Sequence, residues 1–468
     1  MSRAAIIGGG VIGGGWAARF LLNGWDVAVF DPDPEAARKI NDVLLGARRA
    51  LPMLYDRALP AEGRLTFCDT LEEAVAGAAW VQESVPERLA LKHSVLKSLQ
   101  DVVSEEAVIG SSTSGFTPSQ LQEGSARPGQ IIVTHPFNPV YLIPLVEVVG
   151  SAENDAEMLE KADSILTSLG MFPLRVRAEI DAHIADRLLE AVWREALWLV
   201  SDGIATTEEI DNAIRYGFGL RWAQMGLFET YRIAGGEAGM KHFMEQFGPA
   251  LAWPWTKLMD VPEFTPELVD LIATQSDAQS GALDIRALER LRDDNLVAMM
   301  RALKQRDAAA GALLNAHEAT LPKPPEQVPL RSVERVIPVD WTDYNGHMNE
   351  GRYGQIFSDA ADAVMAEIGA DATYIAGGLS YFTVETTVKY LKETHAGERV
   401  HVASRITLAD GKKLRLWHEM IRSADDTVLA SCDQFLLHVS LETRASCPPA
   451  PTVLAKLGAL ARQHGATE

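Results

Sequence analysis

The chain contains few cysteines for its length. Cys68, Cys432 and Cys447 are its only three, and no two of them form a CxxC pair. A disulfide framework or a cysteine-rich metal site needs more thiols at closer spacing, so both classes are excluded, and we expect no metal cofactor. So few thiols are typical of a reducing compartment, and we expect a cytoplasmic protein.

The chain also lacks long apolar runs and an excess of positive charge. It has no run of about 18 apolar residues, the length that suggests a membrane-spanning helix, so we expect no membrane partner. Lysine and arginine number 43 against 64 aspartates and glutamates, which gives a formal net charge of −21. Such a surface repels phosphates, which argues against a nucleic-acid partner.

The N-terminal residues are typical of a strand, a glycine-rich turn and a helix. The expected strand Arg3–Ile7 leads directly into GGGVIG, a GxGxxG sequence. In a dinucleotide-binding fold, the first glycine allows the tight turn, the second admits the pyrophosphate, and the third lets the helix pack against the sheet. The residues expected to contact the cofactor here are Gly8, Gly10, Val11, Ile12 and Gly13.

An acidic residue after the next expected strand indicates which dinucleotide binds. Asp26–Phe30 is closed by Asp31, which lies 23 residues after Gly8 (31 − 8). About 20 residues is the usual distance to the carboxylate that binds the adenosine ribose. The charge of Asp31 would repel the 2′-phosphate of NADP, and the Pro-Asp-Pro that follows offers no arginine to bind one. The sequence therefore predicts NAD.

Three further strands are expected within Ala74–Gln82, at Ala107–Gly110 and at Ile131–Thr134. The first leads into Glu-Ser-Val-Pro-Glu and the second into Ser-Ser-Thr-Ser-Gly. Because ligands of an open parallel sheet bind beyond the carboxyl ends of its strands, we expect these polar loops to face the cofactor. Ordinary turn capping is the alternative explanation for the loop hydroxyls.

A histidine and a glutamate follow the third of these strands in an apolar stretch. His135 and Glu147 lie twelve positions apart (147 − 135) in HPFNPVYLIPLVE. Histidine titrates near neutral pH, so it can take the hydroxyl proton of an alcohol while a hydride moves to NAD. A carboxylate can orient the ring and stabilise the imidazolium, and a buried carboxylate nearly always has a partner. A structural pairing without catalytic use is the alternative.

The same residues resemble the 3-hydroxyacyl-CoA dehydrogenase family. HPFNPVYLIPLVEVV is similar to the family signature HxFNPxxxxxLVEVV, and the resemblance covers roughly residues 1–320. It implies a Rossmann domain and a helical dimerising domain, so we expect a homodimer. It also implies that His135 is the general base and Glu147 its partner, that Ser114 and Asn138 hold the substrate oxygen, and that Glu87 and Lys92 line the nicotinamide side.

The chain departs from the family at two positions. Ser112 replaces an asparagine of the family's Ser-Asn-Thr-Ser loop, and Asp186 replaces the asparagine of an Asn-Arg pair on the first long helix, expected at Ala182–Ser201. A carboxylate there suits a positively charged substrate. Asp186, Glu190 and Trp193 lie at i, i+4 and i+7, which is one helical face. Carboxylates beside an indole can cage a quaternary ammonium group, where cation–π attraction contributes about 0.5–2 kcal/mol.

Other aromatic residues are candidates for the same cage. Half of the ten tryptophans fall in one region, at Trp193, Trp198, Trp222, Trp253 and Trp255. Phe137, Tyr141, Trp222 and Tyr231 are the further candidates, although any single aromatic could instead belong to a core or an interface. Within the family, the resemblance is to members that oxidise the 3-hydroxyl of L-carnitine, a trimethylammonium compound, and are fused to a thioesterase.

The hydrophobic period changes from 3.6 to 2 after the proline-rich stretch Ala319–Pro329. A strand at Arg331–Val339, a polar loop WTDYNGHMN and an alanine-rich helix at Glu350–Ile368 are expected next. A central helix followed by antiparallel strands is an α+β pattern. The four expected strands are Ser380–Leu391, Arg399–Leu408, Leu414–Ser423 and Val428–Val439.

The segment WTDYNGHMNEGRY resembles the hotdog-fold thioesterases, over about residues 330–460. The resemblance implies that a loop carboxylate attacks the thioester or activates water, while the helix N-terminus polarises the carbonyl. Asp343 has the position of that carboxylate, and Glu385 is an alternative acid. Asn345, His347 and Asn349 are expected to bind substrate, although turn formation alone could explain these residues. In the fused members the implied substrate is betainyl-CoA.

The composition of the chain is typical of helices from Asp155 onward, up to the proline-rich stretch. The sequence therefore predicts four segments. They are an α/β Rossmann domain at 1–180, an all-α dimerisation and substrate domain at 181–320, a linker at 321–330 and an α+β hotdog-fold domain at 331–468. The leading hypothesis is a carnitine-oxidising, betainyl-CoA-hydrolysing enzyme. The alternatives are a 3-hydroxyacyl-CoA dehydrogenase with a general acyl-CoA thioesterase, and a non-enzymatic protein comparable to the lens crystallins that retain this dehydrogenase fold.

Overall fold

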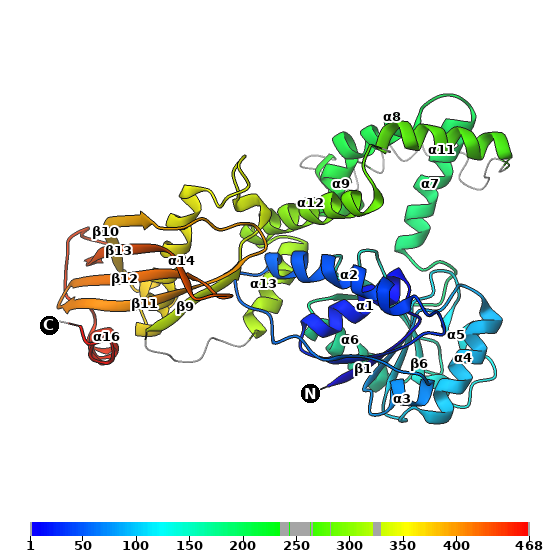
Figure 1. The fold of residues 1–468 in the computed structure, drawn as a ribbon, viewed down its shortest axis with the longest axis horizontal. Helices are drawn as coiled ribbons and strands as arrows, with labels where there is room; N and C mark the ends of the chain where they lie inside the picture. Colours follow the sequence, from blue (N-terminus) through cyan, green and yellow to red (C-terminus); the bar gives the residue numbers. More distant parts are fainter. Residues whose placement is uncertain are drawn as a thin grey trace. The chain divides into compact units, whose positions relative to one another are not determined.

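A computed structural model describes residues 2–234, 243, 263, 265–280, 282–321 and 329–466. The chain divides into two compact units (Figure 1). The first unit contains Met1–Ala47 and Glu62–His317, and the second contains Arg48–Ala61 and Glu318–Glu468. The second unit thus includes a short segment that precedes most of the first in sequence. The domain boundaries expected from the sequence remain predictions.

An eight-stranded sheet forms the centre of the first unit, in the order β3-β2-β1-β4-β5-β6-β7-β8. The pairs from β3 to β6 are parallel, the β6–β7 pair is antiparallel, and the β7–β8 pair is parallel. The strand order reverses between β1 and β4, which is where such sheets bind ligands. The strands are β1 (Arg3–Ile7), β2 (Asp26–Phe30), β3 (Leu65–Phe67), β4 (Trp80–Glu83), β5 (Val108–Ser111), β6 (Ile131–Pro136), β7 (Leu145–Val149) and β8 (Phe172–Val176).

Helices alternate with most of these strands along the chain. Strand residues such as Ile7, Ile109 and Val133 lie in a buried core cluster. Continuous apolar strands of this kind are typical of parallel sheets covered on both faces. The helices of this part are α1 (Val11–Leu22), α2 (Ala36–Ala50), α3 (Leu71–Val75), α4 (Leu89–Val102), α5 (Pro118–Gln122) and α6 (Ala156–Ser168). The Rossmann fold class expected from the sequence is confirmed.

Two strands of this sheet were not expected. The three-residue β3 is too short to show a pattern, and β8 lies where a helical composition was expected from Asp155 onward. The prediction of helix was wrong for β8, because its residues are exposed or half-buried and show no period of 2.

The remainder of the first unit is helical, as expected. It contains α7 (Ala185–Ser201), α8 (Thr207–Ala213), α9 (Gly219–Ala234), α11 (Pro266–Ser280), α12 (Ile285–Gln305) and α13 (Ala310–Thr320). Tyr141, in the loop before β7, donates a hydrogen bond to Asp293 of α12 over 2.6 Å and so ties these helices to the sheet. None of the described helices is long and apolar enough to span a bilayer.

The second unit contains a five-stranded antiparallel sheet in the order β10-β13-β12-β11-β9. The helix α14 (Glu350–Ile368) packs on it through Ile356 and Phe357, which share a buried cluster with Val402 and Met420. The α+β prediction is confirmed, and the four expected C-terminal strands agree with the structure within two residues. The other elements are β9 (Leu330–Val336), β10 (Leu379–Tyr390), β11 (Arg399–Asp410), β12 (Lys413–Arg422), β13 (Thr427–Ser440) and α16 (Pro451–Gln463).

The segment from Arg48 to Ala61 joins this second unit through buried and ionic contacts. Met53 and Leu54 are fully buried. The Asp56 amide donates to Glu318 Oε1 over 3.0 Å, and Arg335 lies 3.5 Å from the Asp56 carboxylate. Since these partners are distant in sequence, no local pattern could have predicted this assignment.

Candidate active sites

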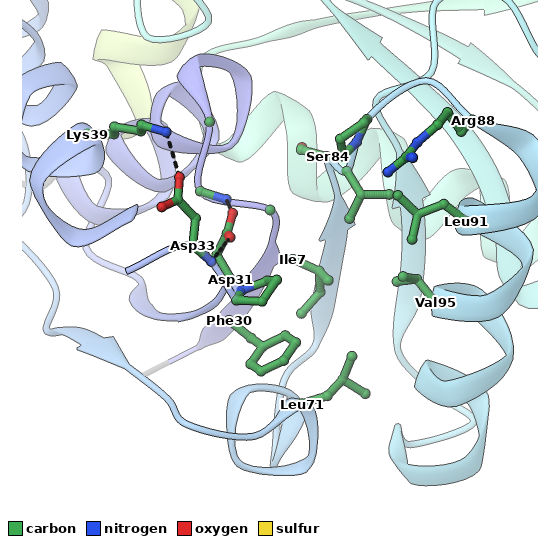
Figure 2. Close-up of a pocket in the computed structure, with 16 residues that line it drawn as sticks. Ile7, Phe30, Asp31, Asp33, Lys39, Leu71, Ser84, Arg88, Leu91 and Val95 are labelled. Carbon is green, nitrogen blue, oxygen red and sulfur yellow. Dashed lines mark hydrogen bonds and ion pairs between the residues drawn. The ribbon is translucent and has the colours of Figure 1, made fainter. Parts of the chain in front are cut away.

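A cavity of about 730 Å³ opens at the carboxyl ends of β1, β2 and β4 (Figure 2). Its lining includes Gly8, Gly9 and Gly10 of the glycine turn and Ser84, Val85 and Arg88, which follow β4. The helix α1 begins after Gly10 without a side-chain cap, so its first amides remain available to an anion.

The glycines of this cavity fit a bound pyrophosphate. A Cβ on Gly8, whose φ is +104°, would lie 2.5 Å from the Ser84 carbonyl oxygen, and one on Gly13 would lie 1.9 Å from the Gly8 oxygen. A Cβ on Gly10 would have no neighbour within 4 Å. The first and third glycines therefore permit close backbone packing, and the second borders open space that a ligand can enter.

Both carboxylate oxygens of Asp31 are held by the backbone. Oδ2 accepts from the Gly9 amide over 2.5 Å and Oδ1 from the Asp33 amide over 2.7 Å. The Lys39 side chain, which also lines the cavity, lies 2.6 Å from Asp33 Oδ2. Asp31 therefore presents an oriented charge to the cavity, as the predicted ribose contact requires, and the lysine already has a carboxylate partner.

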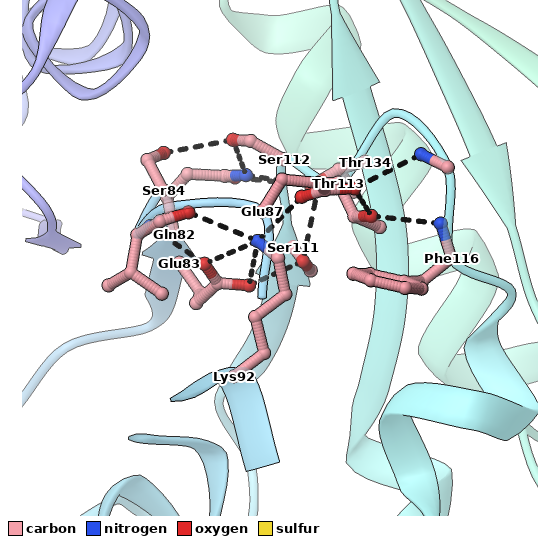
Figure 3. Close-up of polar contacts among 12 residues, drawn as sticks. Gln82, Glu83, Ser84, Glu87, Lys92, Ser111, Ser112, Thr113, Phe116 and Thr134 are labelled. Carbon is pink, nitrogen blue, oxygen red and sulfur yellow. Dashed lines mark hydrogen bonds and ion pairs between the residues drawn. The ribbon is translucent and has the colours of Figure 1, made fainter. Parts of the chain in front are cut away.

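A buried ionic network connects β4, α4 and the serine loop (Figure 3). Lys92, which is 1% exposed, lies 2.9 Å from Glu83 Oε1 and 3.2 Å from Glu87 Oε2. Ser111 donates to Glu83 over 2.5 Å. The sequence predicted Lys92 and Glu87 here but missed Glu83; an acid at the end of an apolar strand was the available signal.

Glu87 extends this network into the loop that contains Ser114. It accepts hydrogen bonds from the Thr113 hydroxyl and from the Gly115 amide, the latter over 3.1 Å. Burial alone would raise the pKa of Glu87, but Thr113 and Lys92 outweigh it and lower the pKa below its ordinary value. An ionised Glu87 therefore holds this loop beside β4.

Ser112 stands where the family has asparagine, and its hydroxyl is hydrogen-bonded to other side chains. Its hydroxyl accepts from Gln82 over 2.8 Å and from the Trp16 indole over 3.2 Å. These contacts explain why a hydroxyl is accommodated at this position.

His135 and Glu147 are directly opposite each other in the antiparallel β6–β7 pair. His135 Nδ1 lies 3.0 Å from Glu147 Oε2, so the predicted hydrogen-bond reach is confirmed. The other glutamate oxygen, Oε1, accepts from the amides of Ile184 and Ala185, each over 2.8 Å. Burial would raise the pKa of Glu147, but the bonds from His135 and these amides lower it overall. The fully buried carboxylate is thus ionised and satisfied.

Two of the residues predicted to bind substrate, Phe137 and Asp186, lie near this pair. Ser114 is half-buried in the serine loop, Asn138 is exposed between β6 and β7, and the Phe137 ring centroid is 4.9 Å from that of His135. Asp186 is half-buried in the first turn of α7. Burial raises the pKa of Asp186, and the His135 charge opposes this shift. Their substrate-binding roles remain predictions.

The other cage candidates are not brought together among the described residues. Trp193 is 58% exposed, and Glu190 pairs with Arg194 over 3.0 Å. The Tyr141 hydroxyl is bonded to Asp293. Trp222 packs against Phe218 with centroids 4.5 Å apart, and Tyr231 stacks on Phe243 at 4.7 Å; Trp253 and Trp255 lie outside the described residues. Spacing placed Glu190 and Trp193 on one helix face with Asp186 without indicating what that face contacts.

The structure also places a histidine that the sequence reasoning missed. His183 is fully buried immediately before α7, with its ring centroid 5.6 Å from that of His135. Nothing in its sequence neighbourhood indicated this contact, because it depends on the packing of the turn against β6.

In the second unit, the polar loop leads into α14. Asp343 is half-buried, and its Oδ1 accepts from the Asn345 amide over 2.8 Å. His347 lies 3.4 Å from Glu393, and the Asn349 side chain caps α14 by accepting from the Gly351 amide over 2.9 Å. The alternative acid, Glu385, is exposed on the edge strand β10. Which carboxylate acts on a thioester remains a prediction.

Family models match most of the chain. The 3-hydroxyacyl-CoA dehydrogenase NAD-binding domain matches residues 3–180, and the C-terminal domain of the same family matches residues 183–264. The thioesterase-like superfamily matches residues 337–457. Together with the cavity and the His135–Glu147 pair, these matches define an NAD-dependent dehydrogenase joined to a thioesterase-like domain.

Relatives that match almost the whole length of this chain indicate a narrower family within this class. The L-carnitine dehydrogenase/betainyl-CoA thioesterase of Ruegeria pomeroyi is 64% identical over 98% of this chain and 96% of its own, and that of Agrobacterium fabrum is 54% identical over 99% and 95%. The chain belongs to this family of L-carnitine dehydrogenase/betainyl-CoA thioesterases. Among solved structures, 5-formyl-3-hydroxy-2-methylpyridine 4-carboxylic acid 5-dehydrogenase, an NAD+-dependent dismutase, is 26% identical with a TM-score of 0.55, over 65% of this chain and 99% of its own.

Glu147→Gln tests the pairing seen in the structure. The neutral amide cannot stabilise an imidazolium, so we expect kcat for alcohol oxidation to fall by about 10²-fold or more while the KM for NAD stays unchanged. Because the folded state lowers the pKa of Glu147, its ionisation stabilises the wild type above the unfolded-state pKa of about 4.3. That contribution disappears as the pH falls through the folded-state pKa.

Steady-state NADH formation and urea unfolding at pH 7 and pH 4 check these expectations. The stability difference between wild type and Glu147→Gln should shrink at pH 4. A variant with wild-type kcat would contradict a catalytic role for the pair.

Proposed function

We propose that the chain oxidises the 3-hydroxyl of L-carnitine with NAD to 3-dehydrocarnitine, and hydrolyses betainyl-CoA to glycine betaine and CoA. The observation that carries the first activity is a half-buried carboxylate, Asp186, within the electrostatic reach of the His135–Glu147 pair. Near-full-length relatives named for both activities support the assignment.

In the dehydrogenase site, NAD supplies the hydride acceptor when bound. His135 takes the hydroxyl proton at Nε2, because Nδ1 faces Glu147 over 3.0 Å and its proton is held there. The ionised Glu147 stabilises the imidazolium that results. Ser114 and Asn138 hold the substrate oxygen, and Glu87 and Lys92 keep the nicotinamide side of the cavity in shape through the network around Glu83.

Asp186 recognises the trimethylammonium group. A quaternary ammonium ion cannot donate a strong N–H hydrogen bond, so charge and aromatic surface are the chemistry that can recognise it. Asp186 supplies the charge beside the base, and Phe137, whose ring contacts that of His135, supplies a nearby aromatic face. Trp193, Trp222, Tyr141 and Tyr231 remain candidates for the rest of the cage.

The working form is a cytoplasmic homodimer. Large apolar side chains on α7 and α9 are exposed, among them Leu188, Leu189, Trp193, Leu220 and Phe228, and exposed apolar surface of this kind is typical of an interface. The edge strand β10 also exposes Phe382 and Val384, and an unpaired edge can pair with a second copy. The three free cysteines suit a reducing compartment.

In the thioesterase site, Asp343 activates water or attacks the thioester carbonyl. Its position in the loop before α14 supports this role, because the dipole of a helix N-terminus can stabilise the developing oxyanion. Asn345, His347 and Asn349 are the polar neighbours that contact the substrate in this proposal. An enzyme for 3-hydroxyacyl-CoA esters with a general acyl-CoA thioesterase remains the alternative.

Asp186→Asn tests whether the dehydrogenase site acts on L-carnitine or on CoA esters. Removing the carboxylate should lower kcat/KM for L-carnitine at least tenfold, about 1.4 kcal/mol, and leave the KM for NAD unchanged. NADH formation is measured with L-carnitine and with 3-hydroxybutyryl-CoA for the wild type and the variant. Asp211→Asn, which removes an exposed carboxylate paired with Arg215 outside the expected cage, is the matched control. Unchanged carnitine turnover in Asp186→Asn, or wild-type preference for the CoA ester, would contradict the proposal.

Asp343→Asn tests the thioesterase acid. Release of CoA from betainyl-CoA should fall by about 10²-fold or more, because the amide can neither attack nor accept a proton, while NADH formation stays at its wild-type rate. Glu385→Gln on β10 is the matched control. If Glu385→Gln loses the activity and Asp343→Asn keeps it, the assignment to Asp343 is wrong.

A further inference from the structure

His183 forms an unusual turn between β8 and α7. Both Ala182 and His183 have left-handed backbone angles, with φ of 59° and 51°. Non-glycine residues seldom adopt this region, and the strain persists only where the surroundings enforce it. The turn is held at one end by the Ala182 amide, which donates to the Gly115 carbonyl over 3.3 Å.

The side chain of His183 is fully buried, and neither ring nitrogen has a partner in hydrogen-bond geometry among the described residues; the Thr113 backbone is a polar neighbour outside that geometry. Leaving a polar atom buried without a partner is destabilising. The contact that the ring does make is with His135, at 5.6 Å between centroids and 48° between planes. Packing, and not hydrogen bonding, is therefore what this ring contributes.

The turn also determines how Glu147 is held. The two residues after His183, Ile184 and Ala185, supply both amides that bond to Glu147 Oε1. If the turn relaxed to ordinary backbone angles, these amides would move and the carboxylate would lose two of its three hydrogen bonds. His183 thus contacts the ring of the base and anchors the donors to the acid.

We propose that His183 is a positioning residue of the dehydrogenase site: its buried neutral ring packs against His135 and anchors the left-handed turn that aims two amides at Glu147. Burial lowers the pKa of His183, and the charge of His135 lowers it further, so the ring stays neutral; Glu147, Asp186 and the Thr113 backbone oppose this shift. The proposal rests on the dehydrogenase activity proposed above.

The test compares His183→Ala with His183→Phe. The alanine variant removes the ring, and we expect kcat for L-carnitine to fall by about 10–100-fold with the KM for NAD unchanged. The acid limb of the kcat profile should move to higher pH, because Glu147 loses amide donors that lower its pKa. The phenylalanine variant keeps a ring of similar volume, so it should restore both kcat and the acid limb.

Thermal unfolding supplies a readout that does not depend on substrate. His183→Phe should unfold at or above the wild-type temperature, because it removes two unpartnered buried nitrogens, and His183→Ala should unfold below it. His317→Ala removes another buried histidine of the same unit, whose ring bonds to the Ser168 carbonyl. It should lower the unfolding temperature and leave the acid limb in place.

Two results would overturn the proposal. Wild-type kcat and pH profile in His183→Ala would show that the ring positions nothing, and equal impairment of His183→Phe and His183→Ala would show that the nitrogens matter instead. If the wild type forms no NADH from L-carnitine, the proposed function fails, and the order of unfolding temperatures still decides whether the ring packs as described.

Discussion

The dehydrogenase site depends on one buried carboxylate. Glu147 is fully buried, and an ionised group there is tolerated only because hydrogen bonds satisfy its oxygens. One oxygen faces His135 and the other accepts two amides at the start of α7. The base, the strand β7 and the N-terminus of α7 are therefore positioned by the same charge. A shift in any one of them leaves a buried charge unsatisfied, which is costly enough to keep the arrangement rigid.

A second buried charge organises the cofactor side in the same way. Lys92 lies between Glu83 and Glu87, and Glu87 in turn bonds the loop that contains Ser114. The loop after β5 is thereby fixed to the strand beside the cofactor cavity. Both halves of the site thus hold a buried carboxylate in a network of hydrogen bonds, Glu147 in one and Glu83 in the other, which preorganises polar groups before a substrate binds.

The features formed by residues close together in the sequence could be predicted. The glycine turn, its strands and Asp31 follow each other within one β–α–β segment, and α14 begins and ends at the expected residues. The His135–Glu147 contact was predictable from two adjacent strands separated by a short loop. Burial of His183, the role of Glu83 and the membership of Met53 and Leu54 in the second unit depend on contacts between distant segments. No local periodicity records such contacts.

The residues of the expected cage also show that local spacing does not predict contacts. The spacing of Asp186, Glu190 and Trp193 correctly predicts a shared helical face, but Trp193 is 58% exposed in one chain. A helical period states which side chains point together and not which surface they meet. The sequence of one helix does not describe the surface that this face contacts.

One chain carries two activities, and we assign them to two separate active sites. The most direct measurement follows both products, NADH from L-carnitine and CoA from betainyl-CoA, for His135→Asn in the full-length chain. NADH formation should fall by about 10²-fold or more while CoA release stays at the wild-type rate. Persistent NADH formation, or equal loss of both activities in a folded protein, would contradict this assignment.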